Sequence, residues 1–239
     1  MKSGMSASIA PAQPDLPAEK STLRSVNLTG PAGRLEAVVN EGAPDAPFAA
    51  LVCHPHPLGG GNLHNKVVYH AMKALNDPEW GLGLPVLRFN FRGTGLSQGT
   101  HDGAAEAGDV LAALGWLENE YRRPLIAAGF SFGAAMTLLA CCGQGQARSD
   151  LRALIALGLP TGADGHNYHY RCLQNCAAAK LFLSRDHDQF APAAQLAQVA
   201  ASAAEPKRLV LLSGADHFFT GHLAAMQKSL AGWLKEQLR

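Results

Sequence analysis

The sequence predicts an α/β protein whose central sheet is mostly parallel. Short apolar segments of the kind expected for buried strands alternate with segments of helical length, which is typical of βαβ units. One junction is distinctive, because an apolar run leads into Gly129-Phe-Ser-Phe-Gly133 and a run of small, helix-forming residues follows. We therefore expect a strand, a tight turn and a helix centred on Ser131.

The other elements are predicted from continuous apolar runs, from turn residues and from helical periodicity. The first two strands should form an antiparallel hairpin across Gly30-Pro-Ala-Gly33, and the later strands should be buried on both faces. The predicted strands are residues 22–29, 34–40, 48–53, 84–91, 125–130, 151–158, 180–184 and 208–213. The predicted helices are residues 65–76, 102–121 with Asp102 as the N-cap, 131–142, 192–204 and 223–238.

Length and composition fit a single α/β domain. The chain has 239 residues, of which 47% are hydrophobic and 16% charged. We assign residues 21–239 to this domain and expect residues 1–20, which are rich in Ala, Pro and Ser, to be a disordered lead-in without a signal peptide. No apolar run reaches the roughly 18 residues of a membrane-spanning helix. We therefore expect a cytoplasmic protein.

The charge balance limits the partners. The net charge is +1 without a basic stripe, so we expect neither nucleic acid nor membrane as a partner, and a monomer or homodimer that acts on a small molecule. The glycine-rich segment 92–99 lacks the spacing of a nucleotide-binding loop. We expect no cofactor.

The cysteines predict reduced thiols. There are five, an odd number, at irregular spacing in a chain without a signal sequence. His166, His169, Cys172 and Cys176 superficially resemble a zinc site, but four ligands within eleven residues would be cramped. We expect no metal site.

A candidate nucleophile, acid and base each follow the end of a predicted strand. Reactive groups in open α/β sheets lie beyond the carboxyl ends of the strands. Ser131 follows strand 125–130, Asp186 and Asp188 follow strand 180–184, and His217 follows strand 208–213. A serine hydroxyl becomes a good nucleophile when an imidazole held by a carboxylate takes its proton. We predict a Ser131-Asp188-His217 triad.

The acid of this triad has two candidates. Asp186 is nearer the end of its strand, whereas Asp188 stands on the loop just before the next helix. We prefer Asp188 and keep Asp186 as the alternative. Asp216 adjoins His217 and is expected to point elsewhere.

An oxyanion hole needs two backbone donors. Phe132, the residue after the nucleophile, should supply one. The loop 54–61 should supply the other, and Pro55 and Pro57 cannot because proline has no N–H. We prefer His56, with Leu58 as the alternative.

Together these residues resemble the α/β-hydrolase superfamily, in particular its small uncapped bacterial serine hydrolases related to dienelactone hydrolases. The resemblance runs from about residue 22 to the C-terminus. It is carried by His54-Pro-His-Pro-Leu with Gly59-Gly60 and Asn65-Lys-Val-Val68, by Arg88-Phe-Asn-Phe-Arg-Gly93 with Gly95, Ser97 and Gly99, by Gly129-Phe-Ser-Phe-Gly-Ala134, and by Gly214-Ala-Asp-His-Phe-Phe219.

The resemblance implies an esterase-like serine hydrolase in which Ser131, Asp188 and His217 occupy the triad positions. Two departures matter. Arg185 stands where such sequences usually have glycine before the acid, and the nucleophile is serine where true dienelactone hydrolases use cysteine. The first leaves the choice between Asp186 and Asp188 open, and the second means that the dienelactone substrate is not carried over.

The connection 159–178 is too short for a large cap, so we expect an open site suited to short acyl esters. Leu58, Tyr168 and Tyr170 are expected to line it. A thioesterase or peptidase with the same triad, or a hydrolase-fold protein that only binds a ligand, are the alternatives.

Overall fold

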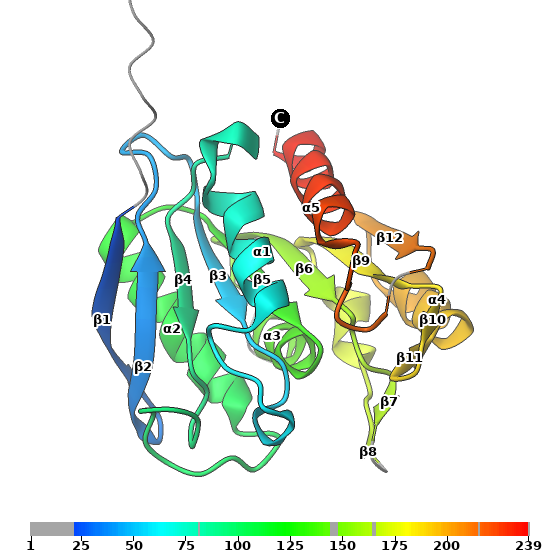
Figure 1. Cartoon of the computed structure of the whole chain (residues 1–239), viewed down its shortest axis with the longest axis horizontal. Helices are drawn as coiled ribbons and strands as arrows, with labels where there is room; N and C mark the ends of the chain where they lie inside the picture. Colours follow the sequence, from blue (N-terminus) through cyan, green and yellow to red (C-terminus); the bar gives the residue numbers. More distant parts are fainter. Residues whose placement is uncertain (1–21, 81, 144–147, 164–165, 215, 239) are drawn as a thin grey trace, which may run out of the picture.

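The computed structural model describes residues 22–80, 82–143, 148–163, 166–214 and 216–238. The predicted lead-in, residues 1–20, lies outside them. Eight strands form one sheet (Figure 1). Across the sheet their order is β1 (Leu23–Gly30), β2 (Gly33–Asn40), β4 (Val86–Phe89), β3 (Ala49–Cys53), β5 (Leu125–Phe130), β6 (Leu151–Leu157), β9 (Ala179–Arg185) and β12 (Lys207–Leu212).

The sheet is parallel from β4 to β12 and antiparallel at its β1–β2–β4 edge. This confirms the predicted fold class, including the N-terminal hairpin. β3 and β5 are buried at every position, because parallel strands in the middle of a sheet are covered on both faces. Two short two-stranded sheets pair β7 (Gly162–Ala163) with β8 (His166–Asn167) and β10 (His187–Asp188) with β11 (Ala191–Pro192).

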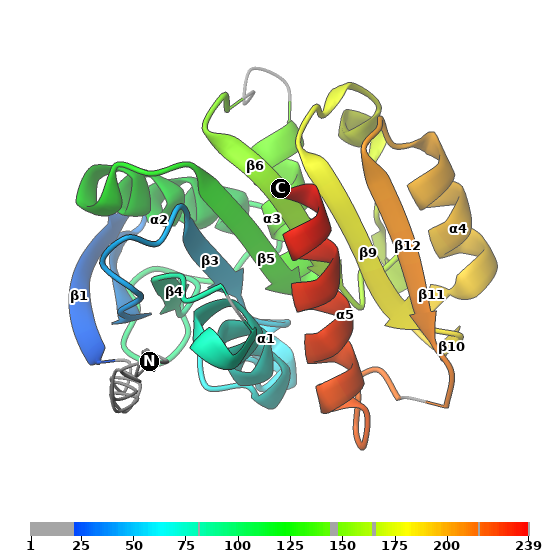
Figure 2. The same ribbon diagram turned by 90° about the horizontal axis from the view of Figure 1, so that it is seen from above.

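Helices cover both faces of the sheet. Figure 2 shows α1 and α5 on one face and α2, α3 and α4 on the other, and a separate apolar cluster fills each side. The helices are α1 (Lys66–Asn76), α2 (Glu106–Tyr121), α3 (Phe132–Cys142), α4 (Ala193–Ser202) and α5 (Leu223–Gln237), with 3₁₀ turns η1 (Pro57–Gly59), η2 (Pro78–Trp80) and η3 (Arg171–Asn175).

The start of α2 corrects the prediction, since the helix begins at Glu106 and Asp102 is not its N-cap. The Asp102 carboxylate accepts hydrogen bonds from the N–H groups of Ala104 (2.8 Å) and Ala105 (2.7 Å) and so forms a turn that ends before the helix begins. Glu106 folds back onto the N–H groups of Asp102 and Gly103, both at 3.0 Å. Aspartate side chains favour such local bonds over continued helix.

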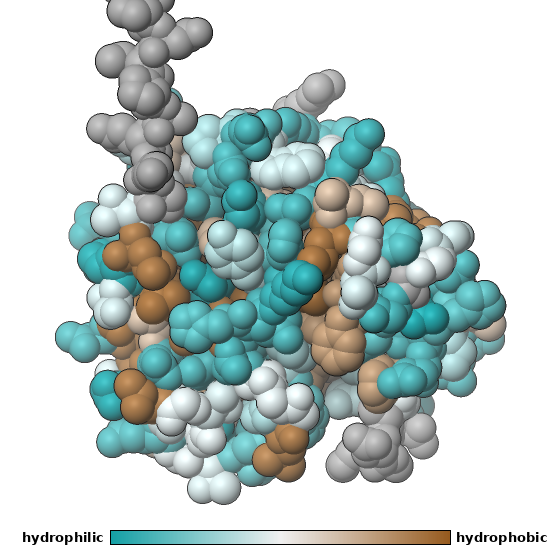
Figure 3. Space-filling view, in the orientation of Figure 1, coloured by the Kyte–Doolittle hydropathy of each residue, from teal (hydrophilic) through white to brown (hydrophobic). Residues whose placement is uncertain are grey.

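The connection between β6 and β9, residues 158–178, contains β7, β8 and η3 and is too short for a cap domain. The surface seen in Figure 3 carries several separate apolar groups among hydrophilic side chains. Within the described residues, no helix is long and apolar enough to cross a membrane.

Candidate active site

Ser131 occupies a strained turn between β5 and α3. Its φ of 53° and ψ of −120° lie where residues with a Cβ are uncommon. Its backbone N–H donates to the carbonyl of Leu157 at 2.8 Å, and its carbonyl accepts the N–H groups of Ala134 and Ala135. The backbone around the serine is thus held by the neighbouring strand and by the first turn of α3.

Both flanking glycines are required by close approaches of the backbone. A Cβ at Gly129 would collide with the carbonyl of Gly133 and the N–H of Ala134, and a Cβ at Gly133 would collide with the carbonyls of Cys53 and His54. The strand, the helix and the end of β3 therefore pack together only with glycine at these two positions. These close approaches explain why glycine stands at both ends of the pentapeptide 129–133.

His217 and Asp188 form a buried pair. Nδ1 of His217 lies 2.8 Å from Oδ2 of Asp188, and the two residues are only 5% and 3% exposed. The other carboxylate oxygen accepts the N–H of Phe190 at 2.9 Å, and the Ser184 hydroxyl donates to Oδ2 at 3.3 Å. Burial raises the pKa of the Asp188 carboxyl, but the bond and charge of His217 and these two donors outweigh it, so the net pKa lies below its usual range.

Asp186 and Asp216 are bound elsewhere. Asp186 is half-buried, and a hydrogen bond with Ser213 is among the contacts that lower the pKa of its carboxyl against the effect of burial. Asp216 is exposed and accepts the N–H of Thr220 at 2.8 Å. Of the three aspartates considered from the sequence, Asp188 is the one that the structure places on the imidazole of His217.

The imidazole lies alongside the turn at Ser131. The ring of Phe130, the residue before the serine, is 5.0 Å from the ring of His217. Gly158 directly follows Leu157, whose carbonyl accepts the N–H of Ser131, and a Cβ on Gly158 would lie 3.1 Å from Cε1 of His217. Since Asp188 holds Nδ1, Nε2 is the nitrogen left for a proton transfer.

The loop 54–61 packs against Phe132, the first residue of α3. The ring of His56 is 5.0 Å from that of Phe132, and the His56 carbonyl accepts the N–H groups of Gly59 and Gly61. The N–H of Leu58 donates to Nδ1 of His56 at 3.2 Å. Leu58 is therefore already engaged within the loop. Phe132 lies in the first turn of its helix, where backbone N–H groups have no intrahelical partner.

Comparisons with known proteins identify the family. No protein-family model matches the sequence. A solved structure of an alpha-beta serine hydrolase homologue from Coxiella burnetii is 34% identical, with a TM-score of 0.77 over 88% of this chain and 97% of that one. The chain belongs to the α/β-hydrolase family. A serine hydrolase without a lid from Xanthomonas campestris is 30% identical, with a TM-score of 0.78 over 94% of this chain and 97% of that one.

Two further proteins resemble this chain. An uncharacterised protein of Rickettsia prowazekii is 35% identical over 220 residues, which are 87% of each chain. A dienelactone hydrolase from Anabaena variabilis has a TM-score of 0.71 over 91% of this chain and 99% of that one, and its 16% identity shows a shared fold. These likenesses support the predicted uncapped α/β-hydrolase group.

Two histidines of this α/β hydrolase have structural surroundings that the sequence analysis missed. His54 is fully buried, accepts the N–H of Phe91 on Nε2 at 3.0 Å and contacts the Pro55 carbonyl through Nδ1. Burial lowers the pKa of its imidazole to about 4. Nδ1 of His101 lies 2.7 Å from Oε1 of the fully buried Glu106, and the ring of His101 packs on that of Phe132. The signal was present for His54, which directly follows a buried strand.

The predicted substrate-contacting residues differ in their exposure. Leu58 is 82% exposed at the tip of its loop. Tyr168 is half-buried and stacks on Tyr170, which is 5% exposed and donates its hydroxyl to the Pro160 carbonyl at 2.6 Å. The Tyr170 hydroxyl is thus used to hold the connection 159–178 in place.

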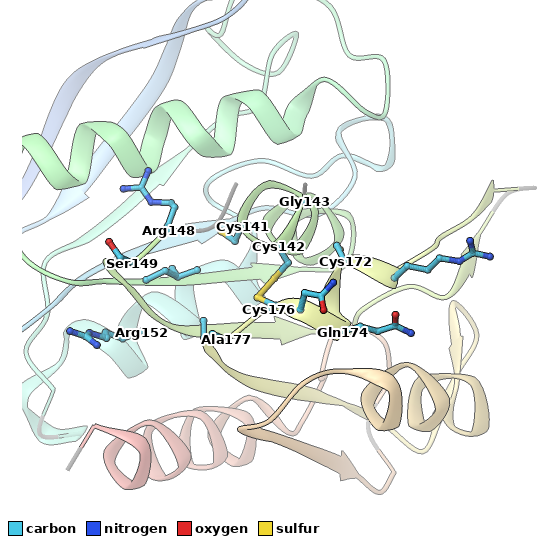
Figure 4. A pocket seen from close by; sticks show the side chains of 14 residues that line it. Cys141, Cys142, Gly143, Arg148, Ser149, Arg152, Cys172, Gln174, Cys176 and Ala177 are labelled. Carbon is cyan, nitrogen blue, oxygen red and sulfur yellow. A yellow bond between two sulfur atoms is a disulfide. The ribbon is translucent and has the colours of Figure 1, made fainter. Parts of the chain in front are cut away.

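A cavity of about 710 Å³ lies at the far end of α3 from Ser131 (Figure 4). It is lined by residues from the end of α3, the start of β6 and η3, and by none of the residues of the predicted triad. A disulfide joins Cys142 and Cys176 there, with their Cα atoms 5.2 Å apart. The prediction of reduced thiols is wrong for these two residues. They are 34 residues apart in the sequence, and only folding brings them together.

Cys53, Cys141 and Cys172 are free thiols. Among the described residues, no group of three or more His, Cys, Asp or Glu side chains is arranged to hold a metal ion. Cys176 of the His/Cys segment considered as a zinc site is part of the disulfide.

Proposed function

We propose that this α/β hydrolase is a serine carboxylesterase that cleaves short-chain carboxylic esters through an acyl-enzyme. Ser131 is the nucleophile, His217 the general base and Asp188 the acid that orients it. The observation that carries the proposal is the 2.8 Å contact between His217 and Asp188 beside the strained turn of Ser131. A nucleophile, a base and an orienting carboxylate delivered in this chain order are the parts that such chemistry requires.

The reaction has two steps, acylation and deacylation, and His217 takes up and returns a proton in each. Oγ of Ser131 attacks the ester carbonyl carbon while its proton passes to Nε2 of His217. The tetrahedral intermediate collapses as His217 gives that proton to the departing alkoxide, which leaves as the alcohol. Water then attacks the acyl-enzyme while His217 takes one of its protons. His217 returns this proton to Oγ of Ser131 as the bond between Oγ and the acyl carbon breaks and the acid product leaves. Asp188 stays ionised throughout, in keeping with the lowered pKa of its carboxyl.

The negative oxygen of the intermediate is held by backbone N–H groups in this proposal. Phe132 supplies one from the first turn of α3, where the helix dipole also favours a negative charge. His56 supplies the other, and the contact of its ring with that of Phe132 supports this assignment. Leu58 is the weaker candidate because its N–H is engaged with the His56 side chain.

A fluorophosphonate probe tests the nucleophile. We expect the purified protein to be labelled, Ser131→Ala to lose all labelling, and Ser25→Ala, an exposed serine on β1, to be labelled like the parent. Peptide mapping should find the probe on Ser131. A folded parent protein that is not labelled would instead support a hydrolase-fold protein that only binds a ligand.

A matched set of acetyl and butyryl oxygen esters, thioesters and anilides then separates the possible activities. We expect the highest kcat/KM for the oxygen esters. A higher value for the thioesters or anilides would reassign the protein as a thioesterase or a peptidase with the same residues.

A further inference from the structure

Three phenylalanine rings surround the imidazole of His217. The ring centroids of Phe190, Phe130 and Phe218 lie 4.6, 5.0 and 5.4 Å from that of His217. Phe130 is fully buried, Phe190 is half-buried and Phe218 is 52% exposed. Of the three rings against the imidazole, those of Phe190 and Phe218 therefore reach the surface of the protein.

The turn after His217 holds Phe218 in this exposed position. Phe219, the next residue, is only 1% exposed and has a φ of 56°, which is rare for a bulky side chain. The N–H of Phe219 donates to the carbonyl of Asp216 at 2.9 Å, and the N–H of Thr220 donates to the side chain of Asp216. One phenylalanine thus anchors the turn in the core, while its neighbour is kept out of the core beside His217.

The backbone of Phe190 is also fixed beside the imidazole. Its N–H donates to Oδ1 of Asp188 at 2.9 Å, and its carbonyl accepts the N–H of Thr161 at 2.9 Å. The Thr161 hydroxyl donates to the side chain of Gln195 on α4 at 2.7 Å. Phe190 is therefore positioned by the same carboxylate that holds His217 and by the connection that follows β6.

Hydrophobic packing explains the position of Phe218 only in part, because about half of this residue (52%) stays exposed. Its place beside the general base has a chemical consequence. In acyl transfer the base returns its proton to the leaving oxygen, so the alcohol portion of the substrate lies beside the imidazole at that step. The rings that pack on Phe132, in contrast, include the polar rings of His56 and His101.

We propose that Phe190 and Phe218 form the leaving-group subsite and that the alcohol portion of the substrate is apolar, with an aryl or arylmethyl group resting on these two rings. The proposal rests on the proposed function, because it uses His217 as the base. It predicts selectivity for the alcohol portion that is independent of the length of the acyl chain.

Benzyl acetate and methyl acetate form the test pair, since they share the acetyl group and both release an unactivated alkyl alcohol. We expect Phe218→Ala to lower the ratio of kcat/KM for benzyl over methyl acetate about tenfold, as the loss of one apolar contact surface implies. Phe190→Leu, which keeps the N–H to Asp188 and an apolar side chain, should lower the ratio less. Leu23→Ala removes a similarly exposed side chain (57%) from β1 at the far edge of the sheet and should leave the ratio within twofold.

A binding measurement separates this proposal from the proposed function. Saturation-transfer NMR on Ser131→Ala protein should show benzyl acetate receiving magnetisation, and the signal should be lost in the Ser131→Ala, Phe218→Ala double variant. If this pattern is seen but the parent protein hydrolyses no ester, Phe218 binds the aromatic group as proposed, but the esterase assignment fails and with it the role of this site in holding a leaving group. If the parent hydrolyses both esters and folded Phe218→Ala keeps the parent ratio, the subsite is overturned and the esterase assignment stands. Absence of both transfer and turnover overturns both.

Discussion

Nδ1 of His217 lies 2.8 Å from Oδ2 of Asp188, and the pair is almost completely shielded from water. The contact joins the loop after β12 to the short strand β10, two segments that meet only because β9 and β12 are neighbours at the end of the sheet. With Nδ1 occupied, Nε2 is the nitrogen that we propose takes the proton of Ser131. The first two predictions test this arrangement from its two ends.

Ser131→Ala should abolish ester turnover while the protein remains folded. We expect kcat to fall by about 10⁴–10⁶-fold, because the three side chains act as a unit. Steady-state kinetics on p-nitrophenyl acetate, with circular dichroism as the check on folding, measures it. A folded variant that keeps most of the activity would remove Ser131 from the mechanism.

Asp188→Asn should reduce kcat/KM far more than Asp186→Asn. An amide at position 188 can donate to Nδ1 and so stabilise the wrong tautomer of His217, for which we expect a loss of about 10³–10⁴-fold. Asp186 is bound to Ser213 instead, so its amide variant should stay within a few-fold of the parent. The reverse ranking would make Asp186 the acid.

Gly158→Ala should disturb His217 without contacting the substrate. Gly158 has a φ of 53°, and an added Cβ would lie 3.1 Å from both His217 and Phe130. We expect kcat to fall about 10–100-fold because the base is displaced. Gly103→Ala is the control, since Gly103 also has a positive φ (90°) but nothing within 4 Å of its Cβ position. Equal effects of the two substitutions on kcat would point to backbone strain alone.

His54 should make the fold sensitive to acid. The pKa of its buried imidazole is about 4, against about 6.5 in an unfolded chain, so the unfolded state binds more protons between these values. The free energy of unfolding should therefore decrease as the pH falls from 6.5 to 4, by about 3 kcal/mol from this residue.

Urea denaturation at a series of pH values measures this loss, which includes contributions from other groups. His54→Gln should be less stable than the parent at pH 7 and show a flatter pH profile below 6.5. His64→Gln, at an exposed histidine in the same part of the chain, should keep the parent profile. Parallel profiles for His54→Gln and the parent would mean that His54 is protonated equally in the folded and unfolded states.

Much of the fold could be predicted from the sequence because the pattern behind it is local. The buried run before Ser131 and the glycines on both sides of it determine the turn without information from the rest of the chain. The start of α2 was misplaced because Asp102 has two local uses, as a helix cap and as the acceptor of a preceding turn, and the sequence does not show which one is adopted.

The features that could not be predicted depend on how distant segments meet. Asp186 and Asp188 are two residues apart, and only the folded β10–β11 turn determines which carboxylate faces His217. Cys142 and Cys176 are 34 residues apart, and their bond depends on η3 packing beside the end of α3. The spacing of the aromatic residues likewise gave no sign that Phe190 and Phe218 would both contact one imidazole.

The length of the acyl chain provides the last prediction. A hydrolase with a cap buries a long acyl chain and gains about 0.8 kcal/mol for each buried CH₂, so its kcat/KM rises steadily with chain length. In this protein the connection between β6 and β9 spans only residues 158–178, and its Tyr170 is directed into the core, where its hydroxyl holds Pro160. We infer from this short connection that little apolar wall is left beyond the first few acyl carbons. We expect kcat/KM for p-nitrophenyl esters to peak at about C2–C6 and then level off or decline.

The fixed leaving group keeps this series independent of Phe190 and Phe218. A continuous rise through C12 would require a deeper acyl pocket, and repeating the series across a range of protein concentrations shows whether a second subunit builds it.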